Sequence, residues 1–377
     1  MHGRVIALDP TSRTAIVRTE REDLRVAAEP SWRVGQLLDT THVPPEPYPA
    51  PGSEVMRMPR VRMQMLRARA QALSAVRTFF AQRGFLEVDT PLLVPSPGLE
   101  IHLDAVQAGD GYLITSPEYS MKRLLAAGFE KIFTVCKCFR ANERGAHHSS
   151  EFTMIEWYRG YDGIHAIARD TEELVHAVCG DHARIGDRKI YVKPPWKRIS
   201  VRAAMQEFAG VRVDGDESAD ELTARVRAAG IPCAPHLAWD DVFFTAWLAR
   251  VDPALAALDH AIIVEDWPTP LAALARRKPN EPGTALRFEA YIGGIELANA
   301  FDELVDANEQ EARFRDEQKQ RYDRGRPVYP IDTKLVAALR EGLPPSGGIA
   351  LGFDRLVMLA TGATDIAQVQ AFSDSER

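Results

Sequence analysis

The sequence predicts an α+β protein, in which helices flank a mostly antiparallel β-sheet and a small β-rich module precedes them. Three observations support this class. Strands and helices do not follow the regular βαβ rhythm of a parallel sheet. Short β-type segments fill the first 42 residues and end at a proline-rich stretch. A Gly-Gly pair at residues 293 and 294 joins two segments of strand character, as in an antiparallel hairpin.

Size and composition narrow the class further. The 377 residues suffice for one large domain and an accessory piece, and 45% apolar with 26% charged residues is ordinary for a globular protein. The net charge of −7 does not indicate general nucleic-acid binding. Four cysteines without a CxxC pair indicate a reducing compartment. We find no apolar run of ~18 residues and no signal peptide, so we expect a cytoplasmic protein without membrane segments.

The domain boundaries follow from local composition. Residues 1–42 contain four short runs such as "GRVIAL" and "TAIVRT", which predict a small β-barrel or meander. Residues 43–56 hold five prolines in their first twelve positions, which excludes a helix or a central strand and predicts a stiff linker. The remaining residues, 57–377, form the predicted large domain.

Within the large domain the segments follow in order. Residues 60–84 predict a helix with an apolar stripe that includes Val76 and Phe80, and Gly84 closes it. A strand interrupted by Pro91 comes next, and strands then alternate with short helices to about residue 178. Residues 195–285 look mainly helical. The last part predicts strands over 286–304, a polar helix over 307–324 and a glycine-rich strand-to-helix junction at 347–360.

Two acids in "LRFEAYIGGIELANA" predict a metal site. The Gly-Gly turn pairs residue 292 with 295, 291 with 296 and 289 with 298, so Glu289 and Glu296 share a face as diagonal neighbours. Two carboxylates together with substrate phosphates suit Mg²⁺. An exposed charged hairpin is the alternative interpretation. Glu303 has the wrong parity for that face, so we expect a bulge or bend near 298–300 to turn it inward.

Three other stretches carry candidate residues. In "EFTMIEWY", alternation places Phe152, Met154, Glu156 and Tyr158 on one face, which suits a cation pocket. The glycine-rich "GGIALGFDRL" allows close approach to a ligand, but it is neither a Rossmann nor a P-loop motif. In "TSPEYSMKRL", Glu118 either completes a helix cap or faces a ligand amine.

Together these stretches resemble the catalytic core of a class II aminoacyl-tRNA synthetase of the lysyl type, over about residues 60–372. The order of the motifs agrees: a helix and strand with Pro91, then Arg140 before a loop and a returning strand, then Gly352 and Arg355. "TSPE", "EFTMIEWY" and "GGIELANAFDEL" are similar to the lysyl-specific signatures. The resemblance implies a class II synthetase-like antiparallel sheet flanked by helices, and a homodimer, since Pro91 belongs to the dimer interface in that superfamily.

The narrower resemblance is to the stand-alone paralogues that ligate (R)-β-lysine to elongation factor P. The 42 residues before the predicted linker are too few for the five-stranded anticodon-binding OB-fold of a lysyl-tRNA synthetase. "FRANERG" and "ELAN" also favour the paralogues. The N-terminal module departs from their pattern, since they usually begin near the first helix.

The resemblance implies ATP and Mg²⁺ as cofactors and assigns residues by position. Arg140 and Arg355 correspond to the catalytic arginines, and Glu289 and Glu296 to the metal ligands. The positions implied for ATP are Arg140, Asn142, Glu143, His148, Ser149, Phe152, Glu296, Leu297, Gly352 and Arg355. The positions implied for the amino acid are Ser116, Pro117, Glu118, Glu156, Tyr158, Asn299 and Glu303. Ser149 replaces the usual asparagine, and whether Asn142 or Glu143 meets adenine stays open.

The implied activity is formation of a lysyl or (R)-β-lysyl adenylate and transfer of the acyl group to a lysine of elongation factor P, with tRNA not expected as a partner. The substrate carboxylate is ionised at neutral pH, so the first step needs positioning and charge neutralisation rather than a general base. A truncated lysyl-tRNA synthetase that charges tRNA and a non-catalytic amino-acid sensor are the alternatives.

Overall fold

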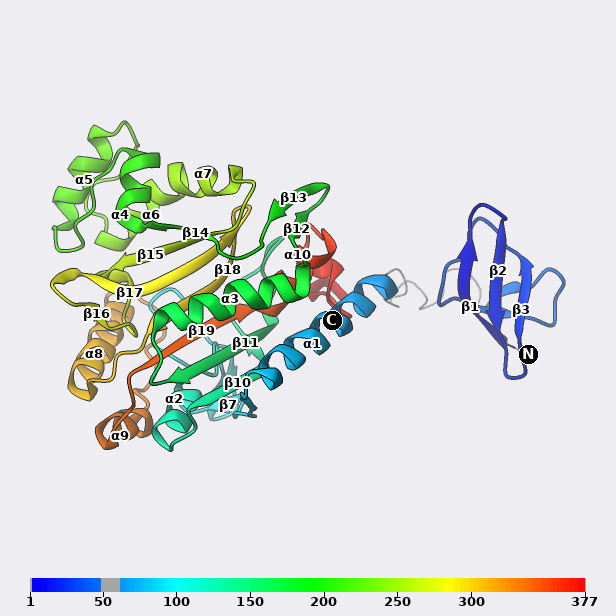
Figure 1. Ribbon diagram of the computed structural model, residues 1–377, viewed down its shortest axis with the longest axis horizontal. Coiled ribbons are helices and arrows are strands. Elements are labelled where there is room, and N and C mark those ends of the chain that lie inside the picture. The colour runs from blue at the N-terminus through cyan, green and yellow to red at the C-terminus, as the bar shows by residue number, and fades with distance from the viewer. Residues whose placement is uncertain (1, 49–61, 377) are drawn as a thin grey trace. The chain divides into compact units, whose positions relative to one another are not determined.

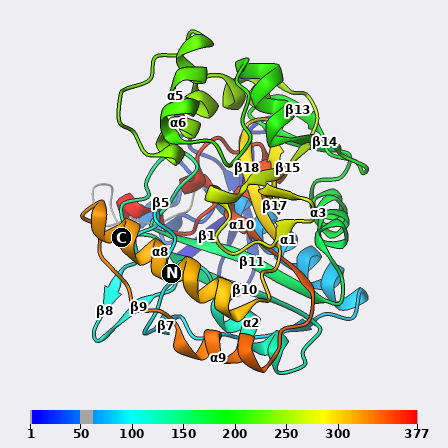
Figure 2. The ribbon, with the colours of Figure 1, turned by 90° about the vertical axis from the view of Figure 1, so that its left-hand side faces the viewer.

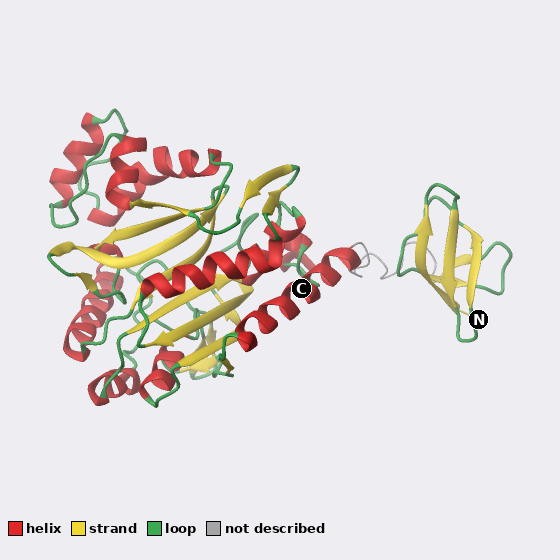
Figure 3. Cartoon of the chain, viewed as in Figure 1, coloured by secondary structure: helices red, strands yellow, loops and turns green. Residues whose placement is uncertain are grey.

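The computed structural model describes residues 2–48 and 62–376 (Figure 1). The chain divides into two compact units, Met1–Ala70 with Ala367–Arg377 and Gln71–Ile366. Figure 3 distinguishes helices from strands in both units. The mixture of a largely antiparallel sheet with separate helices confirms the predicted α+β class.

The N-terminal sheet has five antiparallel strands in the order β3-β2-β1-β4-β5. These are β1 (His2–Asp9), β2 (Thr14–Arg18), β3 (Asp23–Ala27), β4 (Leu37–Asp39) and β5 (Glu46–Tyr48). Burial alternates along β1 and β2, and Val5, Val17, Trp32 and Leu38 form a small core. Burying one face of each strand is what stabilises so short a sheet.

The strand β5 corrects the predicted domain boundary, because it lies inside the stretch 43–56 that the proline content assigned to a linker. Proline is compatible with an edge strand, where its missing N–H is not required by a second neighbour. The β-rich module therefore extends at least to Tyr48, six residues beyond its predicted end. The rest of the predicted linker, residues 49–56, lies outside the described residues.

The main sheet has nine strands in the order β14-β15-β17-β18-β19-β11-β10-β6, and β16 pairs with β17. Its strands are β6 (Leu86–Glu87), β10 (Lys131–Phe139), β11 (Glu151–Gly160), β14 (Lys197–Ser200), β15 (Ile262–Pro268), β16 (Arg277–Lys278), β17 (Glu281–Ile292), β18 (Ile295–Asp302) and β19 (Ser346–Gly352). Only the two outermost pairs, β10–β6 and β14–β15, are parallel. The central strands pair antiparallel, so residues of four strands face one side together.

Helices cover both faces of this sheet (Figure 1). The face of Trp157 packs against α1 (Met63–Gln82) and α3 (Ile164–Cys179), since Phe80 contacts Trp157 and Ile167 lies over Gly347. The face of Tyr158 packs against α2 (Glu118–Ala126), α8 (Ala307–Asp323) and α9 (Thr333–Glu341). The last helix, α10 (Phe353–Thr361), follows β19 directly. Two smaller sheets pair β7 (Leu93–Val94), β8 (Gln107–Ala108) and β9 (Gly111–Leu113), and β12 (His182–Ile185) with β13 (Arg188–Tyr191).

A helical insertion separates β14 from β15 and lies beside β15 and β17 (Figure 2). It contains α4 (Val201–Ala204), a π-helical turn (Met205–Ala209), α5 (Ala219–Ala228), α6 (Trp239–Ala246), a second π-helical turn (Trp247–Val251) and α7 (Asp252–Ala257). Its apolar side packs onto Trp267 and Tyr291 of the sheet. The prediction of a mainly helical 195–285 is therefore wrong outside 201–257, because strand partners far along the chain organise its two ends.

The hairpin of β17 and β18 contains a bulge, which determines the face of the sheet on which Glu296 and Glu303 lie. The predicted pairs 292–295 and 291–296 are confirmed, but Glu289 pairs with Asn299 rather than with residue 298. Leu297 is the extra residue, one position before the predicted window of 298–300. Beyond it, residues 299, 301 and 303 lie on the same face as Glu296.

The packing of Phe80 yields a stability prediction. Phe80 is fully buried and stacks on Phe133 at 4.4 Å between ring centroids. Phe80→Ala should lower the free energy of unfolding by about 3–5 kcal/mol, measured by urea denaturation of the full chain. Phe129→Ala, at a side chain that is 42% exposed, is the control and should change it by less than about 1 kcal/mol. Equal effects of the two changes would contradict the packing described here.

Candidate active site

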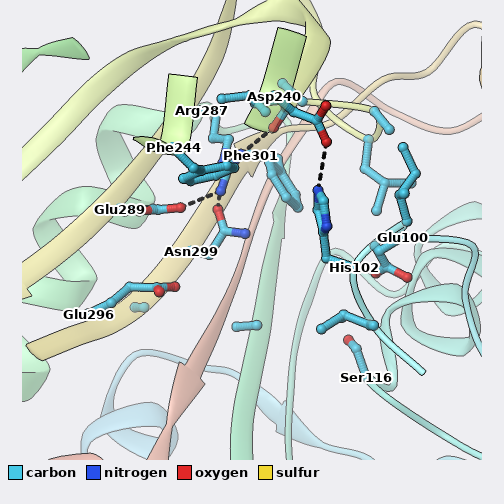
Figure 4. A pocket seen from close by; sticks show the side chains of 18 of the residues that line it. Glu100, His102, Ser116, Asp240, Phe244, Arg287, Glu289, Glu296, Asn299 and Phe301 are labelled. Carbon is cyan, nitrogen blue, oxygen red and sulfur yellow. Dashed lines mark hydrogen bonds and ion pairs between the residues drawn. The ribbon is translucent and has the colours of Figure 1, made fainter. Parts of the chain in front are cut away.

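A cavity of about 1340 Å³ opens on the Tyr158 face of the main sheet (Figure 4). Its floor consists of β11, β17, β18 and β19, and its walls are the loop of residues 98–104, the start of α2, and helices α6 and α8. The predicted residues that line it are Ser116, Glu118, Arg140, Glu143, His148, Ser149, Phe152, Glu156, Tyr158, Glu289, Glu296, Leu297, Asn299, Gly352 and Arg355. The structure thus brings together positions from four separate stretches of the chain.

Three predicted positions do not line the cavity. Pro117 precedes α2, with no lining contact of its own. Asn142 is exposed in the left-handed backbone region with φ of 65°, whereas its neighbour Glu143 faces the cavity. Glu303 is buried behind the cavity wall, where it contacts Lys122. Of the two candidates for adenine, Glu143 is the better placed.

One end of the cavity is rich in groups that suit phosphate. Arg355 donates from Nη1 to the carbonyl of Glu296 at 2.6 Å and from Nε to the carbonyl of His147 at 3.1 Å. Its Nη2 lies 2.7 Å from His148 Nε2, which must accept because guanidinium only donates. Burial and Arg355 lower the pKa of His148, so its ring is neutral at neutral pH.

Arg140 lies at the same end and has hydrogen-bonding capacity to spare. Its guanidinium stands over the Phe152 ring at 5.1 Å and lies 3.6 Å from Glu143. The buried Nε of Arg140 has no hydrogen-bond partner within residues 2–48 and 62–376. A buried N–H without an acceptor is costly, and an anion in the cavity would satisfy it.

The acids of the hairpin fit a shared cation. Glu289 is buried, receives a hydrogen bond from Tyr291 at 2.5 Å and forms an ion pair with Arg287. Burial and the neighbouring Glu296 raise the pKa of Glu289 to about 7. Glu296 pairs with Tyr291, the residue whose hydroxyl bonds Glu289. Among the described residues no group of three metal-ligating side chains occurs. Two carboxylates and substrate phosphates are nevertheless a donor set that Mg²⁺ accepts.

The other end of the cavity is acidic and largely buried. Glu156 is 1% exposed and receives hydrogen bonds from Ser116 at 2.6 Å and Tyr158 at 2.7 Å. Burial and the charge of Glu118 raise the pKa of Glu156 well above its ordinary value. The alternation predicted for residues 151–158 is confirmed, because Phe152, Met154, Glu156 and Tyr158 all line the cavity.

The buried ammonium of Lys122 was not predicted from the sequence. Its Nζ lies 2.6 Å from Glu118 Oε1 and 2.6 Å from Glu303 Oε2. Burial alone lowers the pKa of Lys122, but the two carboxylates outweigh it and keep the ammonium charged. The spacing from Glu118, one helical turn, was a visible signal of this pair. No local sequence pattern indicated the contact between Lys122 and Glu303, because it joins segments 181 residues apart.

The side chain of Glu303 reaches this place because β19 contributes a glycine. A Cβ on Gly348 would lie 2.2 Å from Glu303 Oε1 and 2.2 Å from the Tyr158 ring. Gly348 therefore permits both side chains to cross the strand. Burial raises the pKa of Glu303 to about 8, against the opposite effect of Lys122.

A second cluster that sequence analysis missed joins the insertion to the cavity wall. Asp240 of α6 accepts hydrogen bonds from Arg324 at 2.8 Å and 2.9 Å. It also lies 2.9 Å from His102 Nε2 (Figure 4). These residues come from three distant segments, so no local pattern predicted their meeting.

The family of tRNA synthetases class II (D, K and N) matches residues 54–376. The chain therefore belongs to this class II synthetase family. Curated relatives point to one branch, proteins named elongation factor P–(R)-β-lysine ligase. The relative from Vibrio vulnificus is 37% identical over 338 residues, 83% of this chain and 97% of its own. The relatives from Enterobacter sp. (37%, 84% of this chain and 96% of its own) and Avibacterium paragallinarum (36%, 85% and 98%) agree.

The family confirms the predicted fold class and the resemblance. No helix of the described residues is both long and apolar enough to cross a membrane.

The acidic end predicts how stability depends on pH. The pKa of Glu303 is about 8 in the folded chain against an ordinary 4.5, so between these values the folded state binds more protons than the unfolded state. The free energy of unfolding should therefore decrease as the pH rises from 4.5 to about 8. Glu303→Gln, which cannot ionise, should make the fall in melting temperature shallower. Glu87→Gln, at a surface ion pair with Arg77, is the control and should leave the slope of melting temperature against pH as in the wild type. A wild-type slope in Glu303→Gln as well would contradict this account.

Proposed function

We propose that the protein activates (R)-β-lysine, or lysine, with ATP and transfers the acyl group to a lysine side chain of elongation factor P. One observation carries the proposal: a single cavity has arginines at one end and buried carboxylates at the other. Such a cavity suits an amino acid that carries ammonium groups and whose carboxylate must meet a phosphate. The names of the relatives support the same activity.

In the first step, a substrate carboxylate oxygen attacks the α-phosphorus of ATP and pyrophosphate leaves. Arg140 and Arg355 orient the reacting groups and stabilise the charge that develops on the phosphates. Mg²⁺ held by Glu289 and Glu296 would supply further neutralisation of phosphate charge. In the second step, the neutral amine of the acceptor lysine attacks the acyl carbonyl, the acyl–phosphate bond breaks, and AMP leaves with its electron pair. The proton that the attacking nitrogen loses passes to solvent.

The amino acid is held at the acidic end. Burying an ammonium requires carboxylate partners, and Glu156 with its Ser116 and Tyr158 hydrogen bonds provides a preorganised one. Glu118 and Glu303 share the one positive charge of Lys122, so this end has an excess of negative charge when both carboxylates are ionised. The excess favours a cationic side chain. We further propose a cytoplasmic homodimer that does not use tRNA.

The decisive test compares amino acids and acceptors side by side. Wild-type protein should support ATP–pyrophosphate exchange with (R)-β-lysine or α-lysine and should then label elongation factor P but not tRNA. Exchange followed by charging of tRNA alone would favour a truncated lysyl-tRNA synthetase. Absence of exchange with either amino acid would contradict the enzyme proposal.

The arginines provide a residue-level test of the first step. Arg140→Ala and Arg355→Ala should each lower the exchange rate about 100-fold or more, because each removes charged donors from the transferring phosphates. Arg315→Ala, at a side chain 70% exposed on α8, is the matched control and should leave the rate unchanged. The assigned roles are wrong if either cavity variant exchanges at the wild-type rate with its melting temperature preserved.

A further inference from the structure

Two carboxylates in the cavity have no role in the activity described so far. Glu100 lies in the loop 98–104 and Glu317 on α8, and both line the cavity. Glu317 is only 7% exposed. Oε2 of Glu100 is buried and lacks a hydrogen-bond partner among the described residues. A buried carboxylate oxygen without a partner is costly.

Both carboxylates belong to the same part of the cavity as Glu118. Burial and the charges of Glu100 and Glu118 raise the pKa of Glu317 well above its ordinary value. Burial and Glu118 likewise raise the pKa of Glu100, and the charge of Arg140 acts on it in the opposite direction. Printed contacts bring the three acids together. Arg321, one helical turn after Glu317 on α8, donates to the carbonyl of Glu100 at 2.7 Å. The ring of Tyr119, the residue after Glu118, packs against Phe314 of α8 at 5.5 Å between centroids. Glu100 and Ser116 face the hairpin acids Glu289 and Glu296 across the cavity (Figure 4).

Two of the nearby arginines, Arg321 and Arg313, are occupied by other groups. Arg321, which is fully buried, donates to the carbonyls of Glu100 at 2.7 Å and Leu103 at 2.8 Å, and to Asp104 at 2.7 Å. It thereby fixes the backbone of the loop that carries Glu100. Arg313 donates to the carbonyls of Ala272, Ala273 and Ala275 and to Glu309.

The loop is also shaped to place the Glu100 carboxylate. Gly98 adopts a φ of 120°, which side chains rarely tolerate, and a Cβ there would lie 2.5 Å from Glu100 Oε2. The carboxylate thus occupies space that a glycine leaves open. The space left by Gly98 and the hydrogen bonds from Arg321 to the loop backbone together fix the position of the Glu100 side chain.

We propose that Glu100 and Glu317, with Glu118, bind the ammonium nearest the substrate carboxylate and favour an amine on the β-carbon over one on the α-carbon. This inference rests on the proposed function. An α-amine is adjacent to the carboxylate and needs one acidic partner, for which Glu118 is positioned. Moving the amine one carbon along the chain places it deeper, where two further carboxylates can surround it. Each added ion pair in a partly desolvated site strengthens binding of that isomer.

The test removes charge without changing shape. Glu100→Gln and Glu317→Gln should each raise KM for (R)-β-lysine in ATP–pyrophosphate exchange about tenfold or more, with kcat nearly unchanged, and change KM for α-lysine less than about threefold. Glu100→Asp, which retains the charge, should recover part of the β-preference. Glu311→Gln, on the same helix but paired with Arg315 and Arg340, is the matched control and should behave as wild type.

The outcomes separate this inference from the proposed function. The inference is overturned if the variants raise KM equally for both amino acids. It is also overturned if they raise KM for neither while their melting temperature is unchanged. In both cases exchange by the wild-type protein still supports the proposed function. A wild-type enzyme that activates only α-lysine would also overturn it. Should wild type show no exchange at all, calorimetric titration with (R)-β-lysine still decides: weaker binding by both variants supports the subsite, and equal binding refutes it.

Discussion

The bulge at Leu297 is the constraint on which the cavity depends. Side chains alternate strictly along a regular strand, so Glu296 and Glu303 on a straight β18 would face opposite sides of the sheet. One extra residue in β18 brings Glu296, Asn299 and Glu303 to the same side. The hairpin can then serve both ends of one cavity, with Glu296 beside the arginines and Glu303 beside Lys122. The neighbouring strand β19 complements this with Gly348, which leaves room for the side chains that the bulge turns inward.

Charge balance explains why the acidic end is assembled as it is. Five carboxylates, those of Glu100, Glu118, Glu156, Glu303 and Glu317, lie at or just behind this end of the cavity, and two of them, Glu118 and Glu303, bind the buried ammonium of Lys122. Lys122 neutralises part of this charge and holds two of the acids in fixed positions. A fully neutralised pocket would bind a cationic substrate weakly, whereas five unpaired acids would strongly oppose folding. The structure lies between these extremes, and hydrogen bonds from Ser116 and Tyr158 stabilise Glu156 independently of any cation.

Local patterns in the sequence predicted the parts of the fold that depend on neighbours along the chain. The Gly-Gly turn, the alternation over residues 151–158 and the apolar stripe of α1 are of this kind. The bulge expected near residues 298–300 is also present, at the adjacent Leu297. The strand β15 was missed because β14 and β17 order it. Lys122, Glu100 and Glu317 were overlooked for a similar reason: their roles arise from contacts between distant segments.

The shared ammonium of Lys122 has a thermochemical consequence. With one cation for two buried carboxylates, the ligand-free site retains protons near neutral pH, one of them on Glu303, whose pKa is raised to about 8. A cationic ligand that enters the site stabilises the ionised form and expels protons into the buffer. The heat of binding must then include the ionisation enthalpy of whichever buffer accepts them. Titrations of the same ligand in phosphate and in Tris differ in apparent enthalpy, and the size of that difference counts the protons released.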